Sequence, residues 1–456
     1  MIKHIEIRTF IAFLCALLLG SNASGQDYST ITGNSVANID TMLGAYGYNG
    51  ELEPKIPQEE IIVFQELKAA MAISPATGLS FIEPYMTSSS SAVLFFMQGI
   101  LQAQQGLMDK SIKNLKITIA KHPNFLQAHK KLGIALATTG EFEEAIPYLS
   151  KTINLGNPDS ITYGLLGLCF LNKEQNISAE AAYSQAIIFA PTNMDWKKGL
   201  ARAFLEQQKF NEGISIIEEI LKGKPEDAIL LTAQANAYIG KNQPGKAGAN
   251  FEIIDRMGKS TPLTLMLLGD IYVESEVTDL ALKAYLDALK KESTLNIPTA
   301  LRTANILASR GAIDEAAIYI TKINQFVGDD LEDSDKLGLL KLESRIALGR
   351  GDQERAMVIL EEIIDYDPLD GEALIMLARS YKGKQEYAKA TMFFERAQKV
   401  DKYEVDALIE EAKMLVAQRK FVAAVPLLQR AQNRRPSDRV ARYLQAVRLI
   451  RDSQRL

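Results

Sequence analysis

The stretch that decides the fold runs from residue 131 to residue 153 and reads "KLGIALATTGEFEEAIPYLSKTI". Two apolar runs at helical spacing lie on either side of Gly140, a residue that suits a turn. Gly133 in the first run and Ala145 in the second are small, whereas Leu149, four residues after Ala145, is large and apolar. We therefore predict two helices that approach closely at the small residues, with the large one filling the space beside them.

The same arrangement recurs along the chain. Comparing the sequence with itself at an offset of 34 residues gives units that begin at residues 92, 126, 160, 194, 228, 262, 297, 337, 371 and 405. In every unit the eighth and twentieth residues are Gly, Ala or Ser, and the twenty-fourth is large and apolar. A period of this length predicts a solenoid of stacked helix pairs.

These units resemble the tetratricopeptide repeat (TPR). Besides residues 131–153, the stretch "LARSYKGKQEYAKATMFFERAQ" at residues 377–398 shows the family's pattern of Leu-Gly/Ala, aromatic, Ala, Phe/Tyr and Ala. Gln102 and Ala347 depart from it, because the family usually has an aromatic residue there. The resemblance implies an all-α fold, a right-handed α-solenoid (superhelix) of about ten TPR helix-turn-helix units with a C-terminal capping helix. It also implies protein binding in a concave groove.

The regions outside the repeats have compositions of their own. Residues 1–25 combine Lys3 and Arg8 with the apolar run "TFIAFLCALLLG" and then small residues, a pattern typical of a secretory signal peptide. A retained membrane anchor is the alternative, although the run is shorter than the roughly 20 residues that cross a bilayer. We expect export across an inner membrane into the periplasm. The predicted division of the chain is a signal peptide (1–25), a flexible linker (26–56), an N-terminal helix and connector (57–91), the repeat array (92–438) and a basic capping helix (439–456).

Catalytic and cofactor chemistry finds no support in the sequence. "GKNQPGKA" at residues 240–247 has the glycine and lysine spacing of a phosphate-binding loop, but Ala247 replaces the required hydroxyl and no strand precedes it. We interpret the stretch as a turn between helices, like "RGD" at residues 350–352. His122 and His129 lack further metal ligands at suitable spacing. The formal net charge of -5 does not suggest nucleic-acid binding. We predict a protein that is not an enzyme and needs no cofactor, metal, nucleic acid or small-molecule substrate.

By resemblance to the family, positions 2, 5, 9, 12 and 13 of each first helix line the groove. Near the start of the array these positions are largely apolar and suit a hydrophobic anchor, unless a predicted helix at residues 58–73 folds back and covers them. Toward the other end they are largely basic and favour an acidic ligand segment. The candidate groove contacts are Phe96, Ile100, Lys130, Ile134, Lys198, Arg202, Lys341, Arg345, Arg379, Lys382 and Lys413.

The C-terminal stretch from residue 419 carries ten Lys and Arg against two Asp, although the whole chain is acidic. Its candidate basic patch consists of Arg434, Arg435, Arg439 and Arg442. Two hypotheses follow. The chain is a non-enzymatic scaffold or adaptor of the cell envelope that binds protein segments in its groove. Alternatively, it is an envelope tether whose basic end makes peripheral contact with anionic lipid or an acidic glycan.

Overall fold

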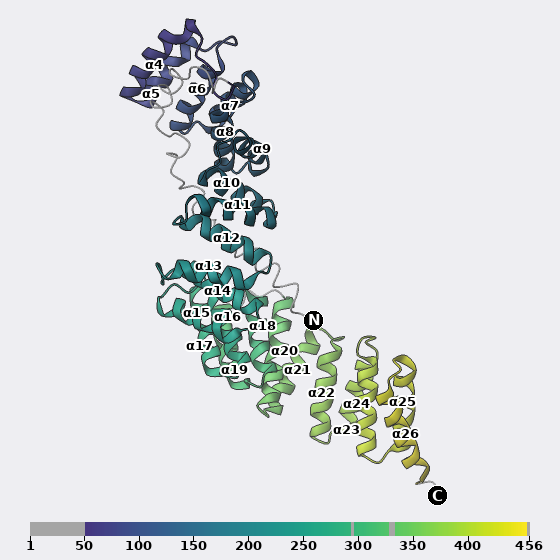
Figure 1. The fold of residues 1–456 in the computed structure, drawn as a ribbon. Coiled ribbons are helices and arrows are strands. Elements are labelled where there is room, and N and C mark those ends of the chain that lie inside the picture. The colour runs from purple at the N-terminus through teal and green to yellow at the C-terminus, as the bar shows by residue number, and fades with distance from the viewer. Residues whose placement is uncertain (1–50, 293–295, 328–332, 454–456) are drawn as a thin grey trace. The chain divides into compact units, whose positions relative to one another are not determined.

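The computed structural model describes residues 51–292, 296–327 and 333–453, which form two compact units divided after Lys259 (Figure 1). In these ranges the chain contains 23 α-helices, two short 3-10 helices and connecting turns. The predicted all-α solenoid is confirmed, because within each unit the helices follow one another as stacked pairs. The predicted signal peptide and residues 26–50 of the predicted linker lie outside the described residues.

The first unit holds the helices up to α15. The α-helices are α4 (Ile61–Ile73), α5 (Pro75–Ile82), α6 (Ala92–Gln104), α7 (Met108–Lys121), α8 (Leu126–Thr139), α9 (Phe142–Asn154), α10 (Ser160–Asn172), α11 (Asn176–Phe189), α12 (Met194–Glu206), α13 (Phe210–Leu221), α14 (Ala228–Gly240) and α15 (Pro244–Arg256). Short 3-10 helices, Gln58–Glu60 and Glu83–Tyr85, precede α4 and follow α5.

The second unit begins after Lys259. Its helices are α16 (Pro262–Glu274), α17 (Thr278–Lys291), α18 (Ile297–Ser309), α19 (Ile313–Val327), α20 (Asp333–Gly349), α21 (Gln353–Tyr366), α22 (Gly371–Gly383), α23 (Tyr387–Ala397), α24 (Glu404–Ala417), α25 (Phe421–Arg434) and α26 (Asp438–Ser453).

The first helix of each repeat begins where the 34-residue period places it, with two differences. α20 begins at Asp333, four residues before the predicted start, and α24 begins at Glu404, one residue early. Several of these helices begin after a residue whose side chain accepts a hydrogen bond from a free amide of the first turn, as Asp159, Asp227 and Asp370 do. Such a cap satisfies backbone donors that have no partner inside the helix.

The small and large residues of the repeat pack against each other as predicted. A methyl group added at Gly133 would lie 2.7 Å from Leu149, and one added at Gly269 would lie 2.4 Å from Tyr285. The eighth, twentieth and twenty-fourth residues of all ten units are buried. Ala247, Ala281 and Ala390 are among them and are fully buried. The close contact between paired helices therefore excludes any larger side chain at these positions.

The turn between the two helices of each repeat has one left-handed residue. In all ten units the fifteenth residue has a positive φ, between 57° and 87°. Four of these residues are glycines, including Gly351 in "RGD", and the turn inside "GKNQPGKA" uses Asn242. Lys246 of that stretch lies 5.3 Å from the centre of the Tyr238 ring. Both stretches are therefore ordinary inter-helix turns.

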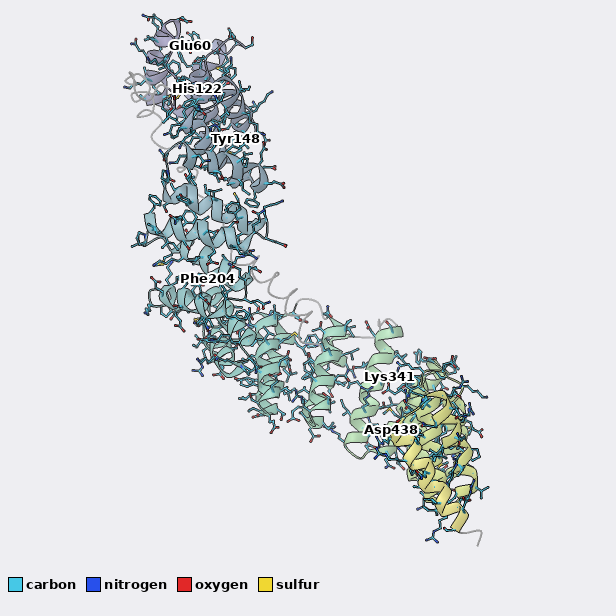
Figure 2. The ribbon with its side chains drawn as sticks, turned by 45° about the vertical axis from the view of Figure 1, so that its right-hand side comes forward. Glu60, His122, Tyr148, Phe204, Lys341 and Asp438 are labelled. Carbon is cyan, nitrogen blue, oxygen red and sulfur yellow. The ribbon has the colours of Figure 1, made fainter. Side chains whose placement is uncertain are left out.

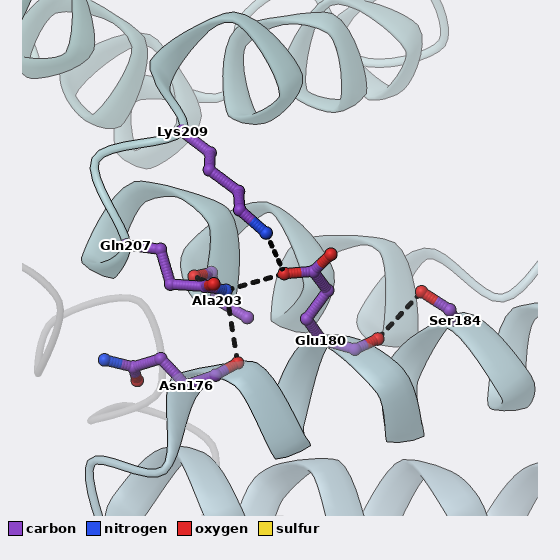
Figure 3. Close-up of polar contacts among 6 residues, drawn as sticks. All are labelled: Asn176, Glu180, Ser184, Ala203, Gln207 and Lys209. Atoms are coloured by element: carbon purple, nitrogen blue, oxygen red, sulfur yellow. Dashed lines mark hydrogen bonds and ion pairs between the residues drawn. The ribbon is translucent and has the colours of Figure 1, made fainter.

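Polar contacts hold successive repeats together on the surface. Glu180 on α11 accepts hydrogen bonds from Gln207 (2.7 Å) and Lys209 (2.6 Å), which belong to the turn after α12 (Figure 3). The Gln207 amide also donates to the carbonyls of Asn176 and Ala203. The hydrogen bond from Lys209 is the main reason that the pKa of Glu180 lies below its usual value, and burial opposes this only in part. The ionised carboxylate thus joins two neighbouring repeats.

The N-terminal region differs from the prediction in two ways. A pair of helices, α4 and α5, precedes the array instead of one helix and a connector, and α5 packs on α6. Glu60, at the start of α4, accepts a hydrogen bond from the amide of Ser91, the residue that caps α6 (2.9 Å).

The predicted linker also needs correction at residues 51–56. Pro54 is buried and Ile56 packs against the core of the first repeats.

The last helix covers the end of the array. Val440, Leu444 and Val447 of α26 are buried against the last repeat, where Leu444 and Val447 share a core cluster with Leu428. Arg439, Arg442 and Arg448 of α26 remain exposed. This arrangement is the capping helix that the apolar stripe of this segment predicts.

Candidate protein-binding surface

The predicted groove lysines at position 5 form a regular pattern of ion pairs. Lys130 pairs with Asp159, Lys198 lies 3.8 Å from Asp227, and Lys341 pairs with Asp370. In each pair the acid is the N-cap of the next first helix, where it also accepts a backbone hydrogen bond. Each aspartate therefore accepts a hydrogen bond from a free backbone amide at the start of its helix, and at the same time it neutralises the charge of a groove lysine.

The predicted cations at position 9 are also paired. Arg345 donates to Glu372 (2.6 Å), and Arg202 lies 3.8 Å from Glu206. Arg379 and Lys413 share Glu410, at 3.2 Å and 2.7 Å. Burial raises the pKa of Glu410, but the hydrogen bonds and charges of these two cations outweigh it, so the pKa is lowered overall.

In the second unit, carboxylates thus alternate with the cations of the largely basic positions that the sequence predicts. Lys382 is the exception among the predicted groove cations: it is half-buried, and its side chain makes no hydrogen bond or ion pair within the described residues.

The predicted apolar end of the groove is closed in the structure. Phe96 and Ile100 are fully buried, and Ile134 is 2% exposed. They belong to one core cluster with Phe64 and Leu67 of α4. Of the two possibilities that the sequence left open, the structure shows the covered one: the N-terminal helix pair shields this surface. An exposed hydrophobic anchor site at these residues is therefore wrong for this conformation.

The basic C-terminal patch is neutralised in part. Arg434 lies 3.1 Å from Glu404, which also pairs with Arg430, and Arg435 lies 2.7 Å from Asp406. Arg442 donates to the Asp438 carbonyl in its own helix. The remaining member, Arg439, is exposed and has no carboxylate partner within the described residues.

A cavity of about 700 Å³ lies where the groove cations and the C-terminal patch meet. Its walls come from α22, α24, α26 and the connection between α25 and α26, all in the second unit; Figure 2 marks Asp438 at the start of α26. Four cations, two carboxylates and several apolar side chains line it. The lining residues are Arg379, Val405, Asp406, Ile409, Glu410, Lys413, Arg435, Ser437, Arg439, Val440 and Tyr443.

The lining combines an apolar wall with a surplus of positive charge. Burial and the nearby charge of Glu410 both raise the pKa of Tyr443, so the phenol stays neutral and can donate a hydrogen bond. Sequence reasoning found Arg379, Lys413, Arg435 and Arg439 separately, as groove and patch residues. It missed Ile409 and Tyr443, because the repeat pattern does not show that α26 faces α24 at this point.

Within the described residues no three His, Cys, Asp or Glu side chains are grouped so that they could hold a metal ion. None of the helices in the described ranges is both long and apolar enough to span a membrane. Cys169 is buried, and burial raises the pKa of its thiol to about 12, which leaves it unreactive.

The fold and this surface define a class of protein: a solenoid of helix pairs that presents side chains of successive repeats along one face. The chain contains tetratricopeptide repeats. Family models described as "Tetratricopeptide repeat" match residues 96–160 and residues 371–403. Proteins of this family generally bind other proteins and are typically non-catalytic scaffolds.

Similarity to known proteins is distributed over parts of the chain. The TPR repeat-containing protein YpiA of Bacillus subtilis is 22% identical over 200 residues, which cover 43% of this chain and 47% of that protein. The BBSome complex member BBS4 of Bos taurus is 24% identical over 217 residues, covering 47% of this chain and 41% of the relative. The chain thus spans less than half the length of these curated relatives.

Among solved structures, the C-terminal part of a TPR repeat-containing protein from Cytophaga hutchinsonii is similar to 53% of this chain. The similarity covers 96% of that structure with 16% identity and a TM-score of 0.39. The MamA protein is similar to 37% of this chain and 92% of its own, with 21% identity and a TM-score of 0.35.

Proposed function

We propose that this protein is a non-enzymatic adaptor that binds a segment of a protein partner in the cavity between α22, α24 and α26. The single observation that carries the proposal is the lining of that cavity, where four cations face two carboxylates beside an apolar wall. A partner segment with an acidic residue next to a large apolar residue complements both parts.

Each part of the lining has a distinct role in this proposal. Val405 and Ile409, both half-buried, provide apolar surface for an anchor side chain, which supplies most of the affinity when it leaves water. Arg439 has no carboxylate partner within the described residues and is therefore free to pair with the ligand. Arg379 and Lys413 already share Glu410, so they contribute mainly to the local positive potential.

A charge-reversal pair tests this surface. Arg439→Glu removes the unpaired cation of the cavity, whereas Arg448→Glu reverses an exposed cation on α26 outside it. We expect affinity capture with the full chain, followed by mass spectrometry, to recover a partner that Arg439→Glu loses and Arg448→Glu keeps. Binding should weaken as salt rises, because the attraction is between exposed charges. A partner that both variants retain equally would refute the cavity as its binding site.

We place the adaptor in the cell envelope, as an exported periplasmic protein. Support for this location comes from residues 1–25, which carry the features of a signal peptide. Cell fractionation with an antibody against the array tests it, and recovery of the protein in the cytosol would contradict it.

The alternative function is a tether that touches anionic lipid or an acidic glycan through its basic end. It is favoured by the exposed Arg439 and Arg442 on α26, and weakened by the pairing of Arg434 and Arg435 with acids. Sedimentation with vesicles of anionic phospholipid distinguishes the two functions. If the protein is a tether, it should bind the vesicles, and Arg442→Glu should reduce this binding as much as Arg439→Glu does. If it is an adaptor only, it should not bind the vesicles.

A further inference from the structure

Among the first helices of repeats whose N-cap is described, α24 begins after Tyr403 without a side-chain cap, and so does α8. The residue before α8 is Phe125, which has no side chain able to accept hydrogen bonds from the first turn, whereas α6, α10, α12, α14, α16, α18 and α22 each have their own capping side chain. The first amides of α8 therefore need partners from elsewhere in the chain.

Residues 51–56, here called the strap, provide those partners. The Leu52 carbonyl accepts a hydrogen bond from the Leu126 amide (2.9 Å), and the Glu53 carboxyl accepts one from the Gln127 amide. His122, which directly follows α7, makes a 3.1 Å hydrogen bond with the Glu51 carbonyl. Figure 2 marks His122 in the first unit. The strap thus replaces the missing cap with groups that are distant in sequence.

Apolar contacts hold the strap down along the same stretch. Pro54 is buried, and Ile56 packs against the core cluster that contains Phe125 and Ala128. In the docked strap Glu53 is half-buried. One of its carboxyl oxygens is shielded from solvent and meets no hydrogen-bond partner in the described part of the chain.

A buried carboxyl oxygen without a donor is costly when it is charged and acceptable when it carries a proton. Burial raises the pKa of Glu53 to about 7, and the hydrogen bond from the Gln127 amide opposes this only in part. In the undocked strap the carboxyl would ionise near its ordinary value of about 4.3. Docking therefore retains a proton that the free strap loses over this range.

Among the described residues, no ion pair joins Glu53 to a cation. Lys130 pairs with Asp159, and His129 is bonded to the Pro123 carbonyl, while burial lowers the pKa of His129. Burial also lowers the pKa of Lys131 to about 8. The positive charge of Lys130 lowers this pKa further, whereas the negative charge of Asp159 raises it in part. The remaining charged and titratable groups around the strap are Lys121 and His122 at the end of α7, and Glu51 and Lys55 on the strap.

We propose that residues 51–56 are a releasable strap that caps α8 while Glu53 is protonated and loosens when Glu53 ionises. The direction of the pH dependence of docking follows from the raised pKa of Glu53. Docking is strongest below about pH 4.3, weakens about tenfold per pH unit up to about pH 7, and is constant above that. Release frees the first-turn amides of α8 and the surface that Pro54 and Ile56 cover.

Hydrogen exchange of the full-length chain tests the proposal. After correction for intrinsic exchange rates, the protection of the Leu126 and Gln127 amides should fall on the order of 30-fold between pH 5 and pH 7. The Thr162 amide, capped by Asp159 within its own repeat, is the internal control and should keep its protection.

Three variants separate Glu53 from its neighbours. Glu53→Gln, nearly identical in shape, should keep the protection of Leu126 and Gln127 high at both pH values, whereas Glu51→Gln should behave as the wild type. His122→Gln is included because His122 is hydrogen-bonded to the Glu51 carbonyl of the strap, and it should retain the fall. Protection that does not change with pH in the wild type would overturn the proposal. So would a fall that persists in Glu53→Gln or disappears in His122→Gln. Because the wild-type profile is decisive by itself, a variant that fails to fold does not remove the test.

Discussion

At the scale of single residues, the fold depends on side chains that must stay small. Ala390 on α23 is fully buried at the twentieth position of its repeat, and Phe394, four residues later, is equally buried. The side chain of Lys382, at the end of α22, makes no hydrogen bond or ion pair within the described residues. The two positions lie in the same repeat but differ completely in how much space a new side chain finds.

We expect Ala390→Leu to destabilise the protein by about 1 to 3 kcal/mol, because three further carbon atoms must enter a close-packed contact. Lys382→Ala should leave the free energy of unfolding nearly unchanged. Urea unfolding of the two variants, followed by circular dichroism, measures both effects. The reverse order of stabilities would contradict the assignment of position 20 to the contact between paired helices.

The left-handed turn residue gives a second prediction at this scale, with opposite signs in two repeats. Gly351 has a φ of 77° and free space around the position of a Cβ atom, so Gly351→Ala should cost about 1 kcal/mol through backbone strain alone. Gln385 occupies the equivalent position with a φ of 65°, and Gln385→Gly should therefore stabilise by up to about 1 kcal/mol. Thermal unfolding measures the direction of each stability change. If both variants were destabilised, backbone strain at the left-handed position would not explain the effects.

At the scale of elements, the caps determine where helices start and how repeats connect. Asp159 accepts the Thr162 amide at 2.8 Å and also pairs with Lys130 of the preceding repeat. Burial raises the pKa of Asp159, but the hydrogen bonds from Lys130 and Thr162 outweigh it, so the pKa is lowered overall. One carboxylate thus stabilises a helix end and a contact between repeats.

The caps also show how far sequence reasoning reaches. The starts of α10, α14 and α22 could be predicted, because an aspartate precedes an apolar helical pattern at the expected period. The strap could not be predicted, because Leu52 and Leu126 are far apart in sequence and residues 51–56 have no helical periodicity. The pairing of Lys341 with Asp370 was missed for a similar reason. Periodicity shows which positions share a face, but does not show which charges across two repeats meet.

The capping aspartate gives a pH prediction. Because the pKa of Asp159 is lowered in the folded state, its contribution is present above the unfolded value of about 3.9 and is lost as pH falls below it. Asp159→Ala should cost about 1 kcal/mol at pH 7 and much less at pH 3. Asp159→Asn keeps a capping side chain and should cost less than Asp159→Ala at pH 7. Urea midpoints at the two pH values measure the difference, and a cost for Asp159→Ala that is equal at pH 3 would refute the explanation.

At the scale of the whole molecule, stability should be local, since in a solenoid each repeat contacts only its neighbours. Core clusters of the second unit illustrate this: one joins α20 to α24, whereas another holds α25 and α26 against the end of α24. A defect introduced in one repeat therefore has few routes by which to weaken a distant one.

Hydrogen exchange of Ala390→Leu tests this locality in the intact chain. We expect faster exchange in α22, α23 and α24, which share the affected contacts, and unchanged exchange in α8, α9 and α10 of the first unit. Gly133→Ala is the matched variant, because its added methyl group would lie 2.7 Å from Leu149; it should speed exchange in α8 and α9 and leave α22 and α23 unchanged. Exchange that accelerates throughout the chain in either variant would mean that the helices unfold as one cooperative body, in which case the nearest-neighbour description of this array would be wrong.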